Sequence, residues 1–154
     1  MTSPVRAARA RLLIPPLLGA IALLLVLPGV ASADLLAFTS PTKNIDCVGF
    51  TPPDSTGVSC LAEKASWRIE PRPCDLDWAA NDILLFTRKV KAGTCRGDVG
   101  PLCTGPCRTL RYGRSLDFGA IRCTSRTNGI TCRYRSGVRA GFRIAFGEYR
   151  IWKR

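Results

Sequence analysis

The sequence predicts a mainly β fold: a small antiparallel β domain of two cysteine-stapled meander units, stabilised by disulfides and preceded by an N-terminal signal peptide. All eight cysteines lie between Cys47 and Cys132, a density typical of small exported domains that are held by crosslinks. Short β-branched and aromatic runs alternate with polar residues, and Gly and Pro recur between these runs. No amphipathic helical stretch competes with this pattern.

The first 33 residues have the pattern of a signal peptide. Three arginines precede an uncharged stretch over residues 12–33, which ends in Ala31-Ser32-Ala33. We expect cleavage after Ala33, which leaves residues 34–154 as a single disulfide-rich β domain with no stable transmembrane anchor. The alternative is an uncleaved anchor, since 22 uncharged residues are enough to span a bilayer, although three prolines interrupt them. Both alternatives place the cysteines outside the cytoplasm.

The first meander unit contains three short strand-like segments. They are Ile45-Asp46-Cys47, Gly57-Val58-Ser59-Cys60 and Trp67-Arg68-Ile69, which read as strand, turn, strand, turn and strand. The following region is less regular. There, residues 77–82 are expected to form one helical turn before a strand over residues 83–86.

The second unit repeats the first. Its segments are Ile121-Arg122-Cys123, Gly129-Ile130-Thr131-Cys132 and Phe142-Arg143-Ile144, and Tyr149-Arg150-Ile151 adds a short further strand. Asn128-Gly129 is a turn signal between the first two segments. Both cysteines, one glycine and three apolar positions agree with the first unit, which favours a duplicated meander.

The two cysteines of each unit face each other across its first hairpin. Directly opposed Cβ atoms in a hairpin lie about 4.5–5.5 Å apart, slightly wider than a disulfide needs. This geometry favours the pairs Cys47–Cys60 and Cys123–Cys132. Eight cysteines nevertheless permit 105 pairings, and spacing alone does not select among them.

Several motifs follow one another along residues 38–149. They are Phe38-x-Ser40-Pro41-x-x-Asn44-Ile45-x-Cys47, Gly57-Val58-x-Cys60, Cys74-x-x-Asp77-Trp78, Cys95-x-Gly97-Asp98, Tyr112-Gly113-x-Ser115, Arg122-Cys123-Thr124-Ser125, Gly129-Ile130-Thr131-Cys132, Gly141-Phe142-x-Ile144 and Tyr149. In this order they resemble a family of bacterial exported proteins, domain of unknown function 6636. The resemblance implies a small secreted domain with no known activity.

The resemblance also implies three cysteine pairs, one of which is Cys74–Cys95. Cys103 and Cys107 then remain as an extra pair. The chain departs from the family pattern at residues 139–142, where Arg-Ala-Gly-Phe replaces Gly-His-Gly-Phe. Any function of that histidine in relatives is therefore not expected here.

The basic residues are concentrated in the C-terminal half of the mature chain. Residues 34–100 carry 8 basic and 9 acidic side chains, whereas residues 101–154 carry 12 basic side chains against only Asp117 and Glu148. A basic excess confined to one half of a domain indicates a surface for anionic partners.

Alternation along the strands predicts where these arginines lie. If Ile121, Cys123 and their counterparts point inward, one outer face carries five arginines: Arg122, Arg133, Arg135, Arg143 and Arg150. Guanidinium groups bind phosphates and carboxylates in bidentate fashion. We therefore expect a non-enzymatic binding module for an anionic envelope partner, such as a wall polymer or lipid headgroups. Tyr134 and Phe142 alternate to the opposite face, so specific recognition of nucleic acid is not expected.

Enzymatic chemistry finds little support. The chain contains no histidine, which removes Ser-His-Asp and Cys-His catalysis and the commonest general base. No metal or cofactor site is expected, because no Cys-x-x-Cys pair or glycine-rich phosphate loop occurs. One alternative is a small exported hydrolase with a carboxylate site around Asp75 and Asp77. Another is a secreted effector or inhibitor that uses the arginine face against a protein.

Overall fold

The fold consists of β-strands joined by turns and by two longer connections, over residues 63–76 and 97–107. A computed structural model of the chain describes residues 35–51, 56–137 and 139–153, so the signal peptide expected over residues 1–33 and its cleavage site lie outside it. The strands are β1 (Leu35–Thr39), β2 (Ile45–Phe50), β3 (Gly57–Ala62), β4 (Asp77–Phe86), β5 (Lys89–Arg96), β6 (Arg108–Thr109), β7 (Ser115–Phe118), β8 (Ile121–Arg126), β9 (Gly129–Tyr134), β10 (Gly141–Ile144) and β11 (Tyr149–Trp152). Within the described ranges, no helix has the length and apolarity that crossing a bilayer requires.

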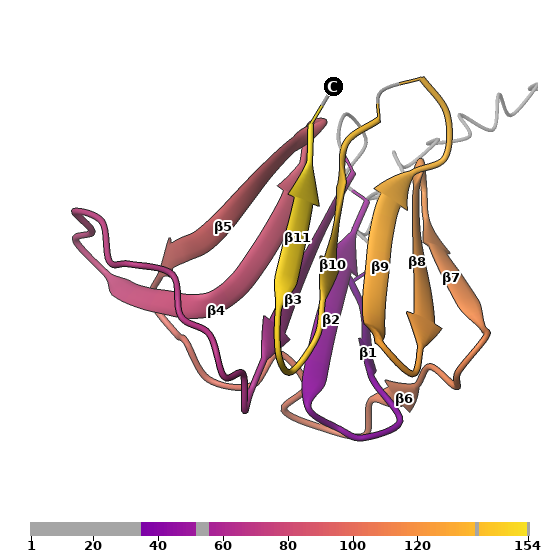
Figure 1. Cartoon of the computed structure of the whole chain (residues 1–154), viewed down its shortest axis with the longest axis horizontal. Coiled ribbons are helices and arrows are strands. Elements are labelled where there is room, and N and C mark those ends of the chain that lie inside the picture. Colours follow the sequence, from indigo (N-terminus) through magenta and orange to yellow (C-terminus); the bar gives the residue numbers. More distant parts are fainter. Residues whose placement is uncertain (1–34, 52–55, 138, 154) are drawn as a thin grey trace, which may run out of the picture. The chain divides into compact units, whose positions relative to one another are not determined.

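The strands form two sheets, with six strands in the order β5-β4-β3-β2-β1-β6 and five in the order β11-β10-β9-β8-β7 (Figure 1). Neighbouring strands are antiparallel except for β1 and β6, which pair in parallel. The mainly β prediction is confirmed, and both predicted cysteine-stapled hairpins are present. Each unit supplies the centre of one sheet, with β2–β3 in the first and β8–β9 in the second.

All four expected disulfides are present in the described part of the chain. Cys47 lies directly opposite Cys60, and Cys123 lies directly opposite Cys132, with Cα atoms 4.1 and 4.0 Å apart. The other two disulfides join Cys74 to Cys95 and Cys103 to Cys107. The pairing favoured by the hairpin geometry and that implied by the family resemblance are both confirmed.

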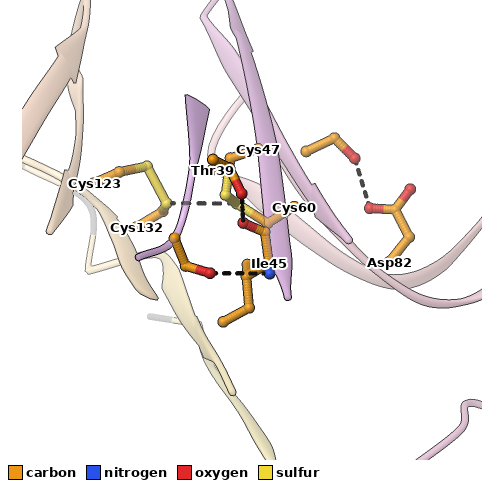
Figure 2. Close-up of a disulfide and its surroundings, with 9 residues drawn as sticks. Thr39, Ile45, Cys47, Cys60, Asp82, Cys123 and Cys132 are labelled. Carbon is orange, nitrogen blue, oxygen red and sulfur yellow. Dashed lines mark hydrogen bonds between the residues drawn. A yellow bond between two sulfur atoms is a disulfide. The ribbon is translucent and has the colours of Figure 1, made fainter. Parts of the chain in front are cut away.

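The two hairpin disulfides meet in the core between the sheets. All four of their cysteines are fully buried, and the Sγ atoms of Cys60 and Cys132 lie 4.0 Å apart (Figure 2). Disulfide sulfurs carry no proton, so this contact is a dispersion contact between polarisable atoms. Nearby, the rings of Phe38 and Phe118 stack at 5.8 Å. The duplicated hairpins therefore pack on each other through their crosslinks.

The helical turn expected at residues 77–82 is wrong, because β4 runs as a strand through this whole region. A bulge accommodates the irregular sequence: Ala79 pairs with Thr94 and Ile83 with Ala92, so three residues of β4 face the single Gly93 of β5. Gly93 has φ +68°, and a Cβ there would lie 2.2 Å from the Trp78 ring. The bulge interrupts the two-residue alternation of β4, and this interruption is why the sequence suggested a helical turn here.

The third segment of the first unit, Trp67-Arg68-Ile69, does not form a strand. The longer β4 takes the place beside β3 instead. The Trp67 indole donates to the carbonyl of Ala145 at 3.0 Å and its ring lies 4.6 Å from that of Tyr149, while the Ile69 N–H donates to β4. The segment therefore straps the two sheets together.

The β4–β5 hairpin contains an unfavourable turn. Its two turn residues, Thr87 and Arg88, have φ of 44° and 63°, a conformation that suits Asn and Gly far better than a β-branched residue. We expect the replacement of Thr87-Arg88 by Asn-Gly to raise the free energy of unfolding by about 1 kcal/mol. Denaturant titration measures this. Thr87→Val, which keeps both the β-branch and the strained backbone, is the control and is expected to give no gain.

Candidate anion-binding face

The five-stranded sheet presents one face to the core and one to solvent. Ile121, Cys123, Ile130 and Cys132 are fully buried, whereas Arg122 and Arg133, which alternate with them, are exposed. The structure places all five arginines of the sequence hypothesis on the solvent face: Arg122, Arg133, Arg135, Arg143 and Arg150. We call this surface the arginine face.

Strand register arranges the arginine face in rows across the sheet. One row reads Asp117, Arg122, Arg133, Gly141 and Trp152 from β7 to β11. The adjacent row reads Ser115, Thr124, Thr131, Arg143 and Arg150 in the same order.

Each row therefore sets two arginines directly opposite each other on neighbouring strands. In the first row the pair is Arg122 and Arg133, and in the second it is Arg143 and Arg150. Like charges in this position destabilise a sheet by some tenths of a kcal/mol or more.

Two carboxylates partly neutralise the face. Glu148 contacts Arg143 and lies 3.3 Å from Nε of Arg150. Asp117 accepts hydrogen bonds from Nε and Nη2 of Arg122 at 2.7 and 2.8 Å, and Nη1 of Arg135 lies 3.6 Å away. Five arginines against two carboxylates leave a charge of +3 on the face.

The Arg122 hydrogen bonds hold the pKa of Asp117 below its ordinary 3.8; burial opposes this lowering, and the attraction of Arg122 and Arg135 adds to it. Because the pKa of the folded state is depressed, the stabilisation is present above pH 3.8 and is lost as the pH falls through the folded-state pKa. The Asp117 side chain is 38% exposed, so solvent and salt keep the effect small.

Arg133 differs from the other four arginines. It makes no ion pair with any residue that the structure describes. It lines an open hollow of about 560 Å³ together with Arg135, Arg139 and the half-buried Trp152. A Cβ on Gly141 would lie 2.8 Å from the Trp152 ring, so the indole covers this glycine in the row beside Arg133. We call this place the arginine hollow.

The sequence hypothesis missed Trp152. Tyr134 and Phe142 do lie toward the core as expected. Trp152 alternates in phase with Arg150, however, and so reaches the same face as the arginines. That spacing was visible in the sequence.

The carboxylates of the alternative hydrolase hypothesis are not enclosed in a pocket. Asp75 and Asp77 are exposed, at the end of a loop and at the first residue of β4. Neither lines the arginine hollow or the second hollow, of about 390 Å³, where turns of the two sheets meet. No group of metal-binding side chains occurs in the described ranges.

Each sheet contains a buried hairpin disulfide, and the second sheet carries the arginine face. Together these features define a small disulfide-stapled β protein with a cationic sheet surface. The model of a family of unknown function (DUF6636) matches residues 19–149, most of the 154-residue chain. The chain belongs to this family. No curated protein and no solved structure matches it.

Proposed function

We propose that the protein is a secreted, non-enzymatic binding module whose arginine face holds an anionic partner in the cell envelope, either a polymer or lipid headgroups. The observation that carries the proposal is the pair of directly opposed arginines in each of two adjacent rows. A sheet surface that only had to stay soluble would alternate charges, because opposed like charges lower stability. Asp117 and Glu148 relieve part of this repulsion, and an anionic ligand placed over both rows relieves the rest.

The arginine hollow is the most suitable place for a single anionic group. Arg133 has its guanidinium donors available, and Arg135 and Arg139 add further positive charge around the same space. Guanidinium forks match the oxygens of phosphate, sulfate and carboxylate. The Trp152 indole supplies an apolar wall against which the carbon skeleton of the ligand packs.

We expect the double variant Arg133→Gln/Arg139→Gln to bind heparin, used as a sulfated probe, about tenfold more weakly than the parent protein at low salt. The variant removes two charge-assisted interactions, whereas the ion pairs of Asp117 and Glu148 stay intact. Arg122 and Arg143 are left unchanged, because replacing them would break their ion pairs with Asp117 and Glu148. The measurement is the dissociation constant at several salt concentrations.

Lys89→Gln/Lys91→Gln on β5 is the matched control, since it removes the same charge from exposed positions of the other sheet. A control that weakens binding as much as the arginine variant would mean that only net charge matters, and the arginine face would lose its role.

Asp117→Asn is expected to strengthen heparin binding at neutral pH by about twofold to threefold, because Arg122 and Arg135 are released from their carboxylate. The parent protein should approach the variant as the pH falls below 3.8 and Asp117 takes up a proton, while heparin sulfates stay ionised. Asp98→Asn, at an exposed site away from the sheet, controls for net charge. Equal gains in the two variants would contradict the prediction.

Export is supported by the use of all eight cysteines in disulfides, which persist in oxidising compartments. We expect the secreted product to begin at Asp34 and to have a mass eight hydrogens below that of the reduced chain. Intact mass spectrometry checks both points. Free thiols in the exported protein would argue against this part of the proposal.

A further inference from the structure

A second hollow, of about 390 Å³, lies where turns of both sheets come together. Its walls come from the β1–β2, β8–β9 and β10–β11 turns and from the segment before β7, and Figure 1 shows these turns at the same end of the strands. Arg143 and Glu148 belong both to this hollow and to the arginine face. We call it the turn hollow.

Two aromatic side chains of the turn hollow are exposed to an unusual extent. Phe146 is 60% exposed and Tyr112 is 44% exposed. Exposed aromatic residues beside a concave site are typical of binding surfaces.

The turn that carries Phe146 is held in place on both sides. The Ser66 N–H donates to the carbonyl of Phe146 at 2.9 Å, and the Trp67 indole donates to that of Ala145 at 3.0 Å. The Ala145 N–H donates to the backbone carbonyl of Glu148 at 3.0 Å, which closes the turn. The ring is therefore presented to solvent by an ordered backbone, which lowers the entropy lost on binding.

The segment that carries Tyr112 is anchored in the same way. The Gly113 N–H donates to the backbone carbonyl of Ser125 at 2.8 Å, and the Arg114 N–H donates to that of Arg111 at 3.0 Å. Just before it, Leu110 is buried and donates its N–H to Thr39.

Five hydroxyl and amide side chains also line the turn hollow. These are Ser40, Thr42, Asn44, Thr127 and Asn128. The carbonyl oxygen of the Asn44 side chain accepts the Lys64 N–H at 2.8 Å, which fixes the amide and leaves its nitrogen as a donor. The Arg143–Glu148 pair adds guanidinium donors and carboxylate acceptors.

We propose that the turn hollow binds a sugar ring, and that the anionic partner of the arginine face is therefore an acidic glycan. This inference rests on the proposed function and names the chemical class of the partner. The C–H face of a pyranose packs against aromatic rings, while its hydroxyls both donate and accept hydrogen bonds. The turn hollow offers both kinds of contact, and the neighbouring arginines hold the acidic substituents of the same chain.

A lipid surface fits the turn hollow less well. Insertion of Phe146 and Tyr112 into a membrane would bury the surrounding amides and hydroxyls away from water, which costs free energy for each unpaired group. A sugar ring satisfies the same groups.

The test compares Tyr112→Ala/Phe146→Ala with the parent protein, using a heparin-derived hexasaccharide and phosphatidylglycerol vesicles as probes. We expect the dissociation constant for the hexasaccharide to rise at least tenfold, while vesicle binding changes less than twofold. Leu36→Ala/Leu76→Ala removes two exposed apolar side chains away from the turn hollow and is expected to leave hexasaccharide binding unchanged. Near-UV circular dichroism checks that the variants keep the fold.

The outcomes separate the two proposals. If Arg133→Gln/Arg139→Gln weakens hexasaccharide binding and the aromatic variant does not, the inference fails while the arginine face keeps its function. If the aromatic variant weakens vesicle binding instead, the turn hollow is a lipid contact and the inference also fails. If neither variant affects either probe, or the parent protein does not bind them, the proposed function fails as well.

Discussion

Replacement of Cys123 and Cys132 by alanine is expected to lower the free energy of unfolding by about 4–5 kcal/mol. Removal of the crosslink raises the conformational entropy of the unfolded chain, which accounts for roughly 3 kcal/mol of the loss. A further contribution of about 1–2 kcal/mol comes from poorer core packing, because alanine lacks the buried sulfur atoms through which Cys132 touches Cys60 (Figure 2). Because a small domain has a total stability of only about 5–15 kcal/mol, the guanidinium titration should give a much lower unfolding midpoint for this variant than for the parent protein.

The surface disulfide Cys103–Cys107 provides the control, since its cysteines lie outside the core and enclose a shorter loop. Its double alanine variant is expected to lose only about 2 kcal/mol. The difference in loop length explains roughly 0.5 kcal/mol of the contrast, so most of it tests the packing of the two core disulfides. Equal losses in the two variants would show that the contact between these disulfides contributes little.

Asp82→Ala is expected to lower the free energy of unfolding by about 3 kcal/mol. The carboxylate is 1% exposed and accepts hydrogen bonds from the hydroxyls of Ser59 and Thr94, both at 2.6 Å, with Nε of Arg96 at 3.6 Å. The bulge in β4 places it among these three groups. Its removal leaves two hydroxyls without their acceptor and a partly buried guanidinium without its ion-pair partner.

The double variant Asp82→Ala/Arg96→Leu is expected to recover part of this loss, because the unpaired guanidinium is gone. Asp98→Ala, at an exposed position two residues after Arg96, should change stability by no more than about 0.5 kcal/mol. A double variant that is less stable than the single one would mean that Arg96 stabilises the fold through other contacts.

The two sheets have different charge patterns. The six-stranded sheet encloses the buried cluster around Asp82 and contributes half of the core. The five-stranded sheet gives its buried side to the same core and carries the opposed arginines on its other side. The disulfides and the Trp67 strap support the second sheet, so the fold tolerates the repulsion among its arginines.

Much of the fold was predictable because strand alternation and hairpin pairing are local. Every second residue points to the same side of a strand, so the sequence alone predicted that Arg122 and Arg133 face away from the buried cysteines. The hairpin argument likewise paired Cys47 with Cys60. The third segment of the first unit failed, since Trp67-Arg68-Ile69 has strand-like alternation and yet serves as a strap.

Local patterns in the chain were enough to establish its crosslinked β character, the two hairpin disulfides and the side of the sheet on which the arginines gather. The surroundings of those arginines follow only from the packing of the folded protein. The bulge that buries Asp82 and the convergence of Tyr112 with Phe146 bring together residues from different strands and turns. Such contacts depend on how whole strands pack, and no short-range periodicity in a sequence records that.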